Sequence, residues 1–329
     1  MAEPTKQITR AAVAAALVLA AANLIGCGQE SEAGETVDRT FTVSGPVRLE
    51  LENASGSSSV RVGAPGEVRV HAEFRVHSWP WEDPGRTLRE VAANPPFSQQ
   101  DSLIRIGHST QDSSQLSAEY SVTVPPDTEM RGVIGSGNLE VNGIAGPANF
   151  TVGSGNISAT AIVGDIRATV GSGNVTLTDP QGRIDAIASS GNVDVRGAKG
   201  EVRARTGSGN LRIEQPGSIV EAEAGSGGIE VRGATADLRL RTGSGEINVD
   251  GNPGPSSYWD IRATSGEVGL NVPSSASFRF YARTGSGDIN VTAPSVADEA
   301  PGKHDFHARI GDGKARVEVE TSSGDVSLH

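Results

Sequence analysis

Cysteine and aromatic residues are scarce in this chain, and their scarcity limits the kinds of protein that it can encode. The single cysteine, Cys27, excludes an internal disulfide and any metal site built from several cysteines. Aromatic residues make up 4% and hydrophobic residues 36%, whereas glycine supplies 42 of the 329 residues. This composition argues against the thick core of a large globular enzyme. It favours a thin core of small, β-branched side chains with many turns.

Positive charge is also in short supply. The formal net charge is −12 at pH 7, whereas nucleic-acid binding needs clustered Lys and Arg to contact the phosphates. We therefore expect no nucleic-acid partner, and the acidic balance fits a soluble domain outside the cytoplasm.

The N-terminal 27 residues have the features of an export signal. Lys6 and Arg10 precede an apolar run at residues 11–22, which is too short to span a bilayer because a spanning helix needs about 20 residues. Residues 24–27 (Leu-Ile-Gly-Cys) then resemble the bacterial lipobox. This resemblance implies a signal peptide over residues 1–27, cleavage before Cys27 and acylation of its sulfur.

An acylated Cys27 predicts a protein anchored by lipid to the cell envelope. Gly28 stands where an Asp would retain such a protein at the inner membrane, so the outer membrane or cell surface is expected if the cell has two membranes. Residues 28–38 are polar and acidic and are interpreted as a flexible tether. A plain secretory signal with an incidental cysteine is the alternative.

A recurring Gly-Ser-Gly tripeptide, or a close variant of it, predicts the fold. The first copy is Gly135, Ser136 and Gly137, followed by Asn138. The central serines recur every 18 residues, at Ser136, Ser154, Ser172, Ser190, Ser208, Ser226 and Ser244. Ser265 and Ser286 follow at intervals of 21, and Ser323 closes the series. These tripeptides are predicted to form the structural corners of a repeat.

Two short strands flank each corner. Apolar residues lie three and five positions after each serine with a polar residue between them, as in Leu139, Glu140 and Val141. A unit of 18 residues cannot bury its own apolar face, so stacking of successive units is required. We therefore predict an all-β fold, a parallel β-solenoid over residues 39–329. Insertions interrupt it at about residues 77–117, 251–258 and 295–307.

Outward polar residues are expected to form ladders along the solenoid. Arginine and glutamate pairs alternate in successive units, at Arg203/Arg205, Glu221/Glu223 and Arg239/Arg241. Asparagines beside the corner recur at Asn138, Asn156, Asn174, Asn192 and Asn210. Stacked asparagine amides can hydrogen-bond along such a rod.

The first insertion contains a candidate binding patch. Trp79, Trp81 and Phe97 could dock a glycan or a protein, since aromatic side chains supply contact area at low entropic cost. The alternative is that they cap the open end of the solenoid.

No catalytic residue, cofactor or metal site is predicted. Each Gly-Ser-Gly leads into a strand and not into a helix, so it lacks the setting of a phosphate-binding loop. The outward acids Asp185, Asp194, Glu230 and Asp260 are spread over several units. His304, Asp305 and His307 lie together in the last insertion and are interpreted as solvated loop residues.

Two segments resemble a known family. Residues 120–128 (Tyr-Ser-Val-Thr-Val-Pro-Pro-Asp-Thr) and 135–141 (Gly-Ser-Gly-Asn-Leu-Glu-Val) are similar to the bacterial "putative adhesin" domain of unknown function, which is DUF4097-like. The autotransporter adhesin head GIN domain is its relative. Both are glycine-rich repeat β-solenoids, and the similarity covers roughly residues 39–329. It implies the architecture and an adhesin-like role, although the turn motifs specify no activity.

These features together predict a non-catalytic, adhesin-like binding or structural module of the cell envelope. Its expected contacts are membrane lipid through Cys27 and a glycan or an envelope protein. A carbohydrate-active β-helix enzyme is the first alternative, and it would need acids clustered on one face. An envelope sensing or signalling protein that binds a partner through residues 77–117 is the second.

Overall fold

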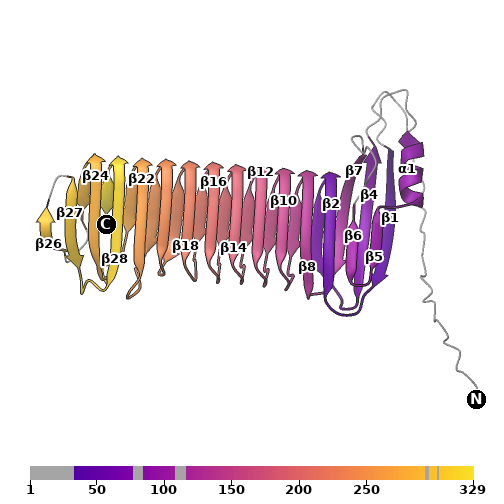
Figure 1. Ribbon diagram of the computed structural model, residues 1–329, viewed down its shortest axis with the longest axis horizontal. Coiled ribbons are helices and arrows are strands. Elements are labelled where there is room, and N and C mark those ends of the chain that lie inside the picture. The colour runs from indigo at the N-terminus through magenta and orange to yellow at the C-terminus, as the bar shows by residue number, and fades with distance from the viewer. Residues whose placement is uncertain (1–32, 77–83, 108–115, 293–295, 302–303) are drawn as a thin grey trace, which may run out of the picture.

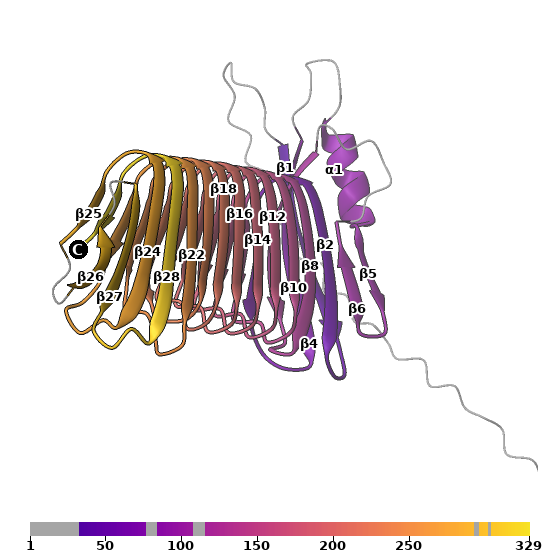
Figure 2. The same cartoon turned by 60° about the vertical axis from the view of Figure 1, so that its left-hand side comes forward.

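The chain forms two long sheets that face each other across a narrow core (Figures 1 and 2). The structure is a computed structural model, and it describes residues 33–76, 84–107, 116–292, 296–301 and 304–329. Sheet A has 14 strands and sheet B has 15. The predicted fold class, an all-β parallel β-solenoid, is confirmed, with one short helix, α1 (Pro84–Ala93), beside it.

The strands follow one another along each sheet in a spatial order that departs from chain order at both ends. Sheet A runs β1 (Ala33–Thr42), β4 (Glu67–Val76), β7 (Leu116–Val124), β3 (Ser58–Val62), β9 (Leu139–Asn142), β11 (Ile157–Thr160), β13 (Val175–Thr178), β15 (Val193–Arg196), β17 (Leu211–Glu214), β19 (Ile229–Ala234), β21 (Ile247–Gly251), β23 (Val268–Asn271), β29 (Val326–Leu328) and β25 (Ile289–Val291). Sheet B runs β26 (Val296–Pro301), β27 (Asp305–Ile310), β24 (Phe278–Ser286), β28 (Ala315–Ser323), β22 (Tyr258–Ser265), β20 (Leu238–Ser244), β18 (Val220–Ser226), β16 (Val202–Ser208), β14 (Ile184–Ser190), β12 (Ile166–Ser172), β10 (Ala148–Ser154), β8 (Thr128–Ser136), β2 (Val47–Ser55), β6 (Leu103–Ile106) and β5 (Phe97–Gln100).

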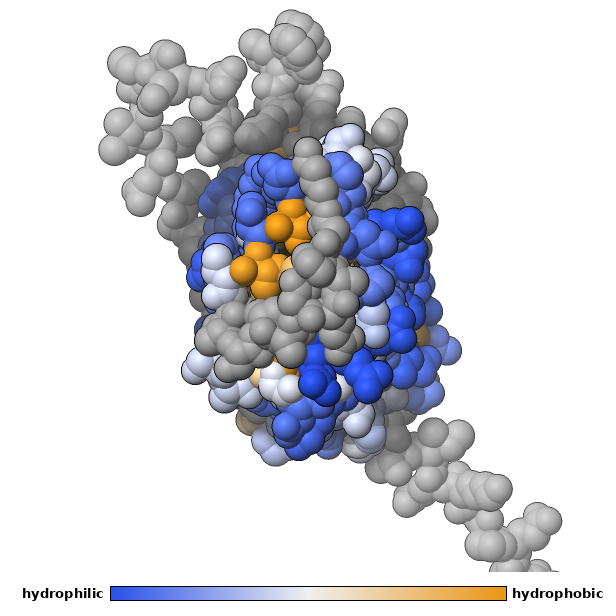
Figure 3. All heavy atoms as spheres, turned by 90° about the vertical axis from the view of Figure 1, so that its left-hand side faces the viewer, coloured by the Kyte–Doolittle hydropathy of each residue, from blue (hydrophilic) through white to orange (hydrophobic). Residues whose placement is uncertain are grey.

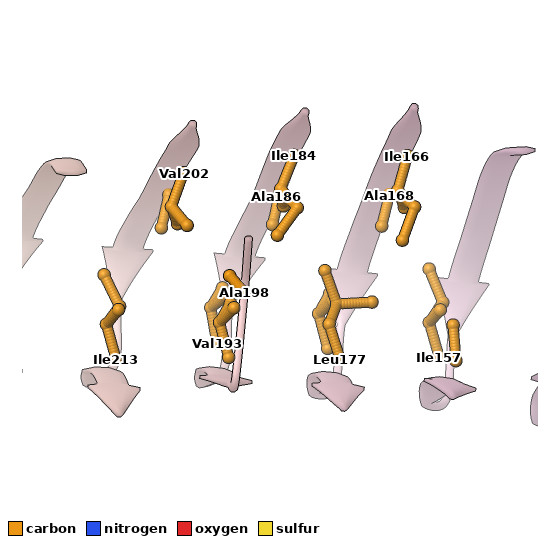
Figure 4. Close-up of a cluster of buried hydrophobic side chains, with 14 of the residues drawn as sticks. Ile157, Ile166, Ala168, Leu177, Ile184, Ala186, Val193, Ala198, Val202 and Ile213 are labelled. Atoms are coloured by element: carbon orange, nitrogen blue, oxygen red, sulfur yellow. The ribbon is translucent and has the colours of Figure 1, made fainter. Parts of the chain in front are cut away.

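The central coils stack in parallel with the register that the 18-residue period dictates. Ser172 pairs with Ser190, and Ser190 pairs with Ser208. Side chains alternate between the core and solvent along each strand, so every coil contributes the same inward positions. Figure 4 shows these inward residues stacked between the sheets, including Ile157, Ile166, Ala168, Leu177, Ile184, Ala186, Val193, Ala198, Val202 and Ile213. Each of them is at most 2% exposed.

Glycine is required at the corner because adjacent coils approach through their backbones. Gly191 has a φ of 141°, and a Cβ atom there would lie 1.8 Å from the carbonyl oxygen of Gly173. No side chain fits at that distance, so only glycine allows the one-strand spacing of the coils at this point. Buried Thr206 donates a hydrogen bond to the Gly191 carbonyl at 2.8 Å, which holds the corner from the inside.

The N-terminal end of the rod is closed by antiparallel strands. β1 pairs with β4 and β4 with β7, while α1 lies against β1 and β4. Because β1 begins at Ala33, residues 33–38 are paired strand and not tether, which corrects the boundary expected from their acidic composition. Half-buried Val37 and Phe41 pack against the core and account for this strand. Within the first insertion, β5 and β6 extend sheet B.

The C-terminal end departs from the order of the chain. The coil made of β28 and β29 lies between the coil of β22 and β23 and the coil of β24 and β25. The third insertion forms β26 and the first residues of β27. Both strands continue sheet B beyond β24 and are antiparallel to their neighbours. Asp305 and His307 therefore stand on a strand and not in a loop.

Candidate functional surface

Of the site residues predicted in the N-terminal part, the structure describes only Phe97. Cys27, Trp79 and Trp81 lie outside the described residues. Phe97 begins β5 and is half-buried, with its ring 6.2 Å from the ring of Tyr120 in an edge-to-face arrangement. Tyr120 is itself buried, and burial raises the pKa of its hydroxyl. Phe97 thus packs on the N-terminal end of the core, whereas the binding patch as a whole stays a prediction.

Asparagines form a continuous hydrogen-bonded ladder beside the corner. The Oδ1 atom of Asn156 accepts bonds from the backbone N–H of Asn174 at 3.0 Å and from its side-chain amide at 3.1 Å. The same backbone bond repeats from coil to coil and ends where Gly228 donates to Asn210 at 2.8 Å. The ladder ties the coils together along one edge, which is a structural role.

Ion pairs cover the outer face of sheet B in the middle of the rod. The Arg203 guanidinium donates to the Glu221 carboxylate on the next coil at 2.9 Å, and this hydrogen bond lowers the pKa of Glu221. Arg205 lies 3.8 Å from Glu223 in the neighbouring row. Exposed pairs of this kind each contribute about 0.2–1 kcal/mol. Their regular alternation also fixes the register, because a slipped coil would place like charges side by side.

Sheet A carries a second charge lattice on its outer face. Arg196 contacts Asp194 at 2.6 Å and Glu214 at 3.3 Å, while Arg212 contacts Glu214 at 2.7 Å and Glu230 at 3.3 Å. The pKa of Asp194 is raised, and partial burial of its carboxyl is the largest cause. These ion pairs link successive coils across the outer face of sheet A.

The four acids considered for glycan hydrolysis do not share a face. Asp185 and Asp260 lie on sheet B four coils apart, whereas Asp194 and Glu230 lie on sheet A. Each stands within 4 Å of an arginine nitrogen. Among the described residues there is also no group of three or more His, Cys, Asp or Glu side chains that could hold a metal ion.

A shallow depression of about 220 Å³ lies at the C-terminal end of sheet B. Four strands contribute to it: Asp260 from β22, Glu318 from β28, Tyr281 from β24 and His307 from β27. Asp260 is only 6% exposed and accepts a hydrogen bond from Arg262 at 2.8 Å. Figure 3 looks onto this end of the rod, where hydrophilic side chains form the rim and hydrophobic ones show near the centre.

Aromatic rings and hydrogen bonds order this depression. The ring of His307 meets that of Tyr281 edge-on at 5.0 Å, and the His307 Nε2 atom lies 2.9 Å from Asp305. The hydroxyl of neighbouring Tyr258 donates to Glu318, which raises the pKa of Tyr258 and lowers that of Glu318. Sequence periodicity did not locate this site, because its strands come from coils whose spatial order differs from the chain order.

The described part of the chain contains no helix long and apolar enough to cross a membrane. Its fold and surface define a class, the repeat-built β-solenoid domains with polar, charge-laddered outer faces. The particular family follows from the sequence: the chain belongs to the Toastrack DUF4097 family, which matches residues 99–329.

Two solved structures are similar to this chain. One is a "putative cell adhesion protein" from Clostridium sporogenes, with 10% identity and a TM-score of 0.18, covering 89% of this chain and 99% of that one. The other is a "putative adhesin" from Bacteroides fragilis, with 10% identity and a TM-score of 0.35, covering 90% of this chain and 97% of that one. No curated protein matches the chain.

Proposed function

We propose that this protein is a lipid-anchored envelope module that binds its partner through the outer surface of a rigid rod and catalyses no reaction. The observation that carries this proposal is the pair of charge-laddered sheet faces, on which acids and arginines neutralise each other in register. Such a face is suited to broad contact with a polar partner. A hydrolase would need its acids free and close together.

The shape of the molecule supports a role in presenting a surface. Sheet B contains 15 strands, and at about 4.8 Å per strand it extends about 67 Å. The first described strand, β1, lies at one end of the rod, whereas β24, β27 and β26 lie at the other end (Figure 1). An acyl group on Cys27 would therefore hold the first end near the membrane and leave the second end projecting away from it.

The anchor is tested with the full chain and a Cys27→Ala variant expressed in bacterial cells. We expect the full chain to incorporate labelled fatty acid and to sediment with the envelope, and the variant to do neither. A Cys27→Ala protein that is still lipid-labelled and envelope-bound would contradict the proposed anchor.

Binding is tested with the detergent-purified full chain on a glycan array and against envelope extract. Saturable binding with no change in the glycan supports the adhesin-like role. Release of reducing ends from any glycan would replace it with the carbohydrate-active alternative. Recovery of a single envelope protein with no glycan bound would favour the sensing alternative.

A further inference from the structure

Three arginines lie side by side on neighbouring strands at the C-terminal end of sheet B. Arg316 on β28 pairs with Arg279 on β24, and Arg279 pairs with Arg309 on β27. All three point outward, and all three are exposed. We call these residues the arginine row. Cross-strand Cβ atoms stand about 5 Å apart, so the Cβ atoms of the three arginines span about 10 Å.

The arginine row departs from the charge pattern of the rest of the rod. In the middle of sheet B, Arg203 has Asp185 and Glu221 as its two cross-strand neighbours. Arg241 and Arg262 are also paired across strands, but Asp260 accepts bonds from both and compensates them.

Two members of the row have no such compensation. Arg316 donates to Glu318 and lies over the ring of Tyr281 at 4.9 Å. Within the described part of the chain, neither Arg279 nor Arg309 forms an ion pair. Like charges placed directly opposite each other are destabilising, so the fold alone gives no reason for this arrangement in a protein of net charge −12.

A glycine turn brings the two unpaired side chains together. A Cβ atom on Gly313 would lie 3.0 Å from Cγ of Arg309 and 3.3 Å from Cγ of Arg279, so both side-chain stems pass over this residue. Gly313 has a φ of 66°, which glycine adopts without strain. The turn before β28 thus leaves room for both arginines on one spot of the surface.

We propose that the arginine row binds the anionic groups of an acidic polysaccharide. Guanidinium groups bind carboxylate, sulfate and phosphate oxygens through paired N–H donors. Beside the row lie the Tyr281 and His307 rings, and beyond them the carboxylates of Asp305 and Glu320. Those groups offer hydrogen bonds to sugar hydroxyls.

An acidic glycan fits this surface better than an anionic membrane does. A membrane presents a continuous negative surface, which a chain of net charge −12 repels. A polysaccharide chain can place single charged groups on the row and its hydroxyls on the acidic residues alongside. This inference rests on the proposed function, because it names the ligand chemistry of a binding module.

The test uses the detergent-purified full chain and three probes with one backbone: dextran, carboxymethyl dextran and dextran sulfate. We expect saturable binding to at least one charged probe, none to dextran, and weakening as salt is raised. The Arg279→Gln/Arg309→Gln variant should bind at least about tenfold more weakly, because a neutral amide replaces each guanidinium that would bind an anionic group, and tenfold corresponds to about 1.4 kcal/mol of binding free energy. The two charged probes distinguish carboxylate from sulfate.

The matched control is Arg167→Gln/Arg203→Gln. It makes the same change in net charge on the same sheet face, at arginines that have acid partners at 3.7 and 2.9 Å. Equal losses in both variants would overturn the inference, because only the overall charge would then matter. Absence of saturable binding to both charged dextrans would also overturn it.

Two further outcomes separate this inference from the proposed function. If the protein binds neutral glycans in the array but neither charged dextran, the proposed binding function is supported and the arginine row is not its ligand site. If the anchor and array tests both fail while carboxymethyl dextran or dextran sulfate binds, the row is a binding site and the proposed function is wrong.

Discussion

The corner glycines are expected to be among the least replaceable residues in the rod, and Gly191→Ala is the sharpest test of this. The new Cβ would lie 1.8 Å from the carbonyl oxygen of Gly173 and 2.7 Å from its carbon, so the coils would have to separate by more than about 1 Å, since real Cβ contacts begin at about 3 Å. The φ of 141° is also unfavourable for alanine.

The magnitude follows from the groups that such a shift disturbs. The N–H of Gly173 donates to Ser190 at 3.0 Å and that of Val175 to Asn192 at 2.9 Å, and both bonds cross the gap that would open. Weakening both bonds costs about 1 kcal/mol each, and the backbone strain adds about 1–2 kcal/mol. We therefore expect Gly191→Ala to lower the free energy of unfolding by about 3–4 kcal/mol, a large effect for one methyl group.

Urea denaturation followed by far-ultraviolet circular dichroism measures this change. Gly228→Ala is the matched control, because its Cβ would meet nothing closer than the Glu246 carbonyl oxygen at 3.3 Å, and the residue has no positive φ. It should change the free energy of unfolding by less than about 1 kcal/mol. If the two variants unfold at the same urea concentration, close backbone approach is not what requires glycine at the corner.

Three further predictions test separate parts of the structure. Asn174→Ala removes one rung of the asparagine ladder and should cost about 1–2 kcal/mol in the same urea assay, whereas no loss would mean that water replaces the ladder bonds. Thr206→Val leaves the Gly191 carbonyl without its internal donor, so it should cost about 1–2 kcal/mol, and Thr206→Ser should recover most of the loss. The hydrogen bond from His71 to Asp38 at 2.8 Å raises the pKa of His71 above its ordinary 6.5. The protonated His71 ring therefore stabilises the fold below pH 6.5, and this stabilisation is lost as the pH rises through the raised pKa. The thermal midpoint should therefore fall over that interval in the parent protein but not in His71→Gln, and parallel pH profiles would contradict the assignment.

The repeated part of the fold could be predicted from the sequence because its cause is local. A strict interval of 18 residues places Ser136, Ser154 and their successors in one row, and alternating apolar residues assign the inner face. Stacking then follows, since no single coil can bury its own apolar side.

The ends could not be predicted in the same way because they depend on contacts between distant segments. Residues 33–38 look like a tether by composition, yet they pair with residues 71–76 of β4. Arg279, Arg309 and Arg316 come from three strands that no local period relates. For Trp79 and Trp81, the choice between cap and binding patch stays a prediction.

The interposed coil of β28 and β29 bears on how the rod is completed. A solenoid whose coils follow chain order can extend by one coil at a time onto the structure already formed. In this chain β24 follows β22 in sequence but pairs with β28, so the segment containing β24 and β25 has no parallel neighbour until residues 315–329 have taken their place. The end of the rod therefore assembles as a unit, and loss of those last residues would remove the support of β24 and of the β26–β27 strands beyond it, together with the whole arginine row.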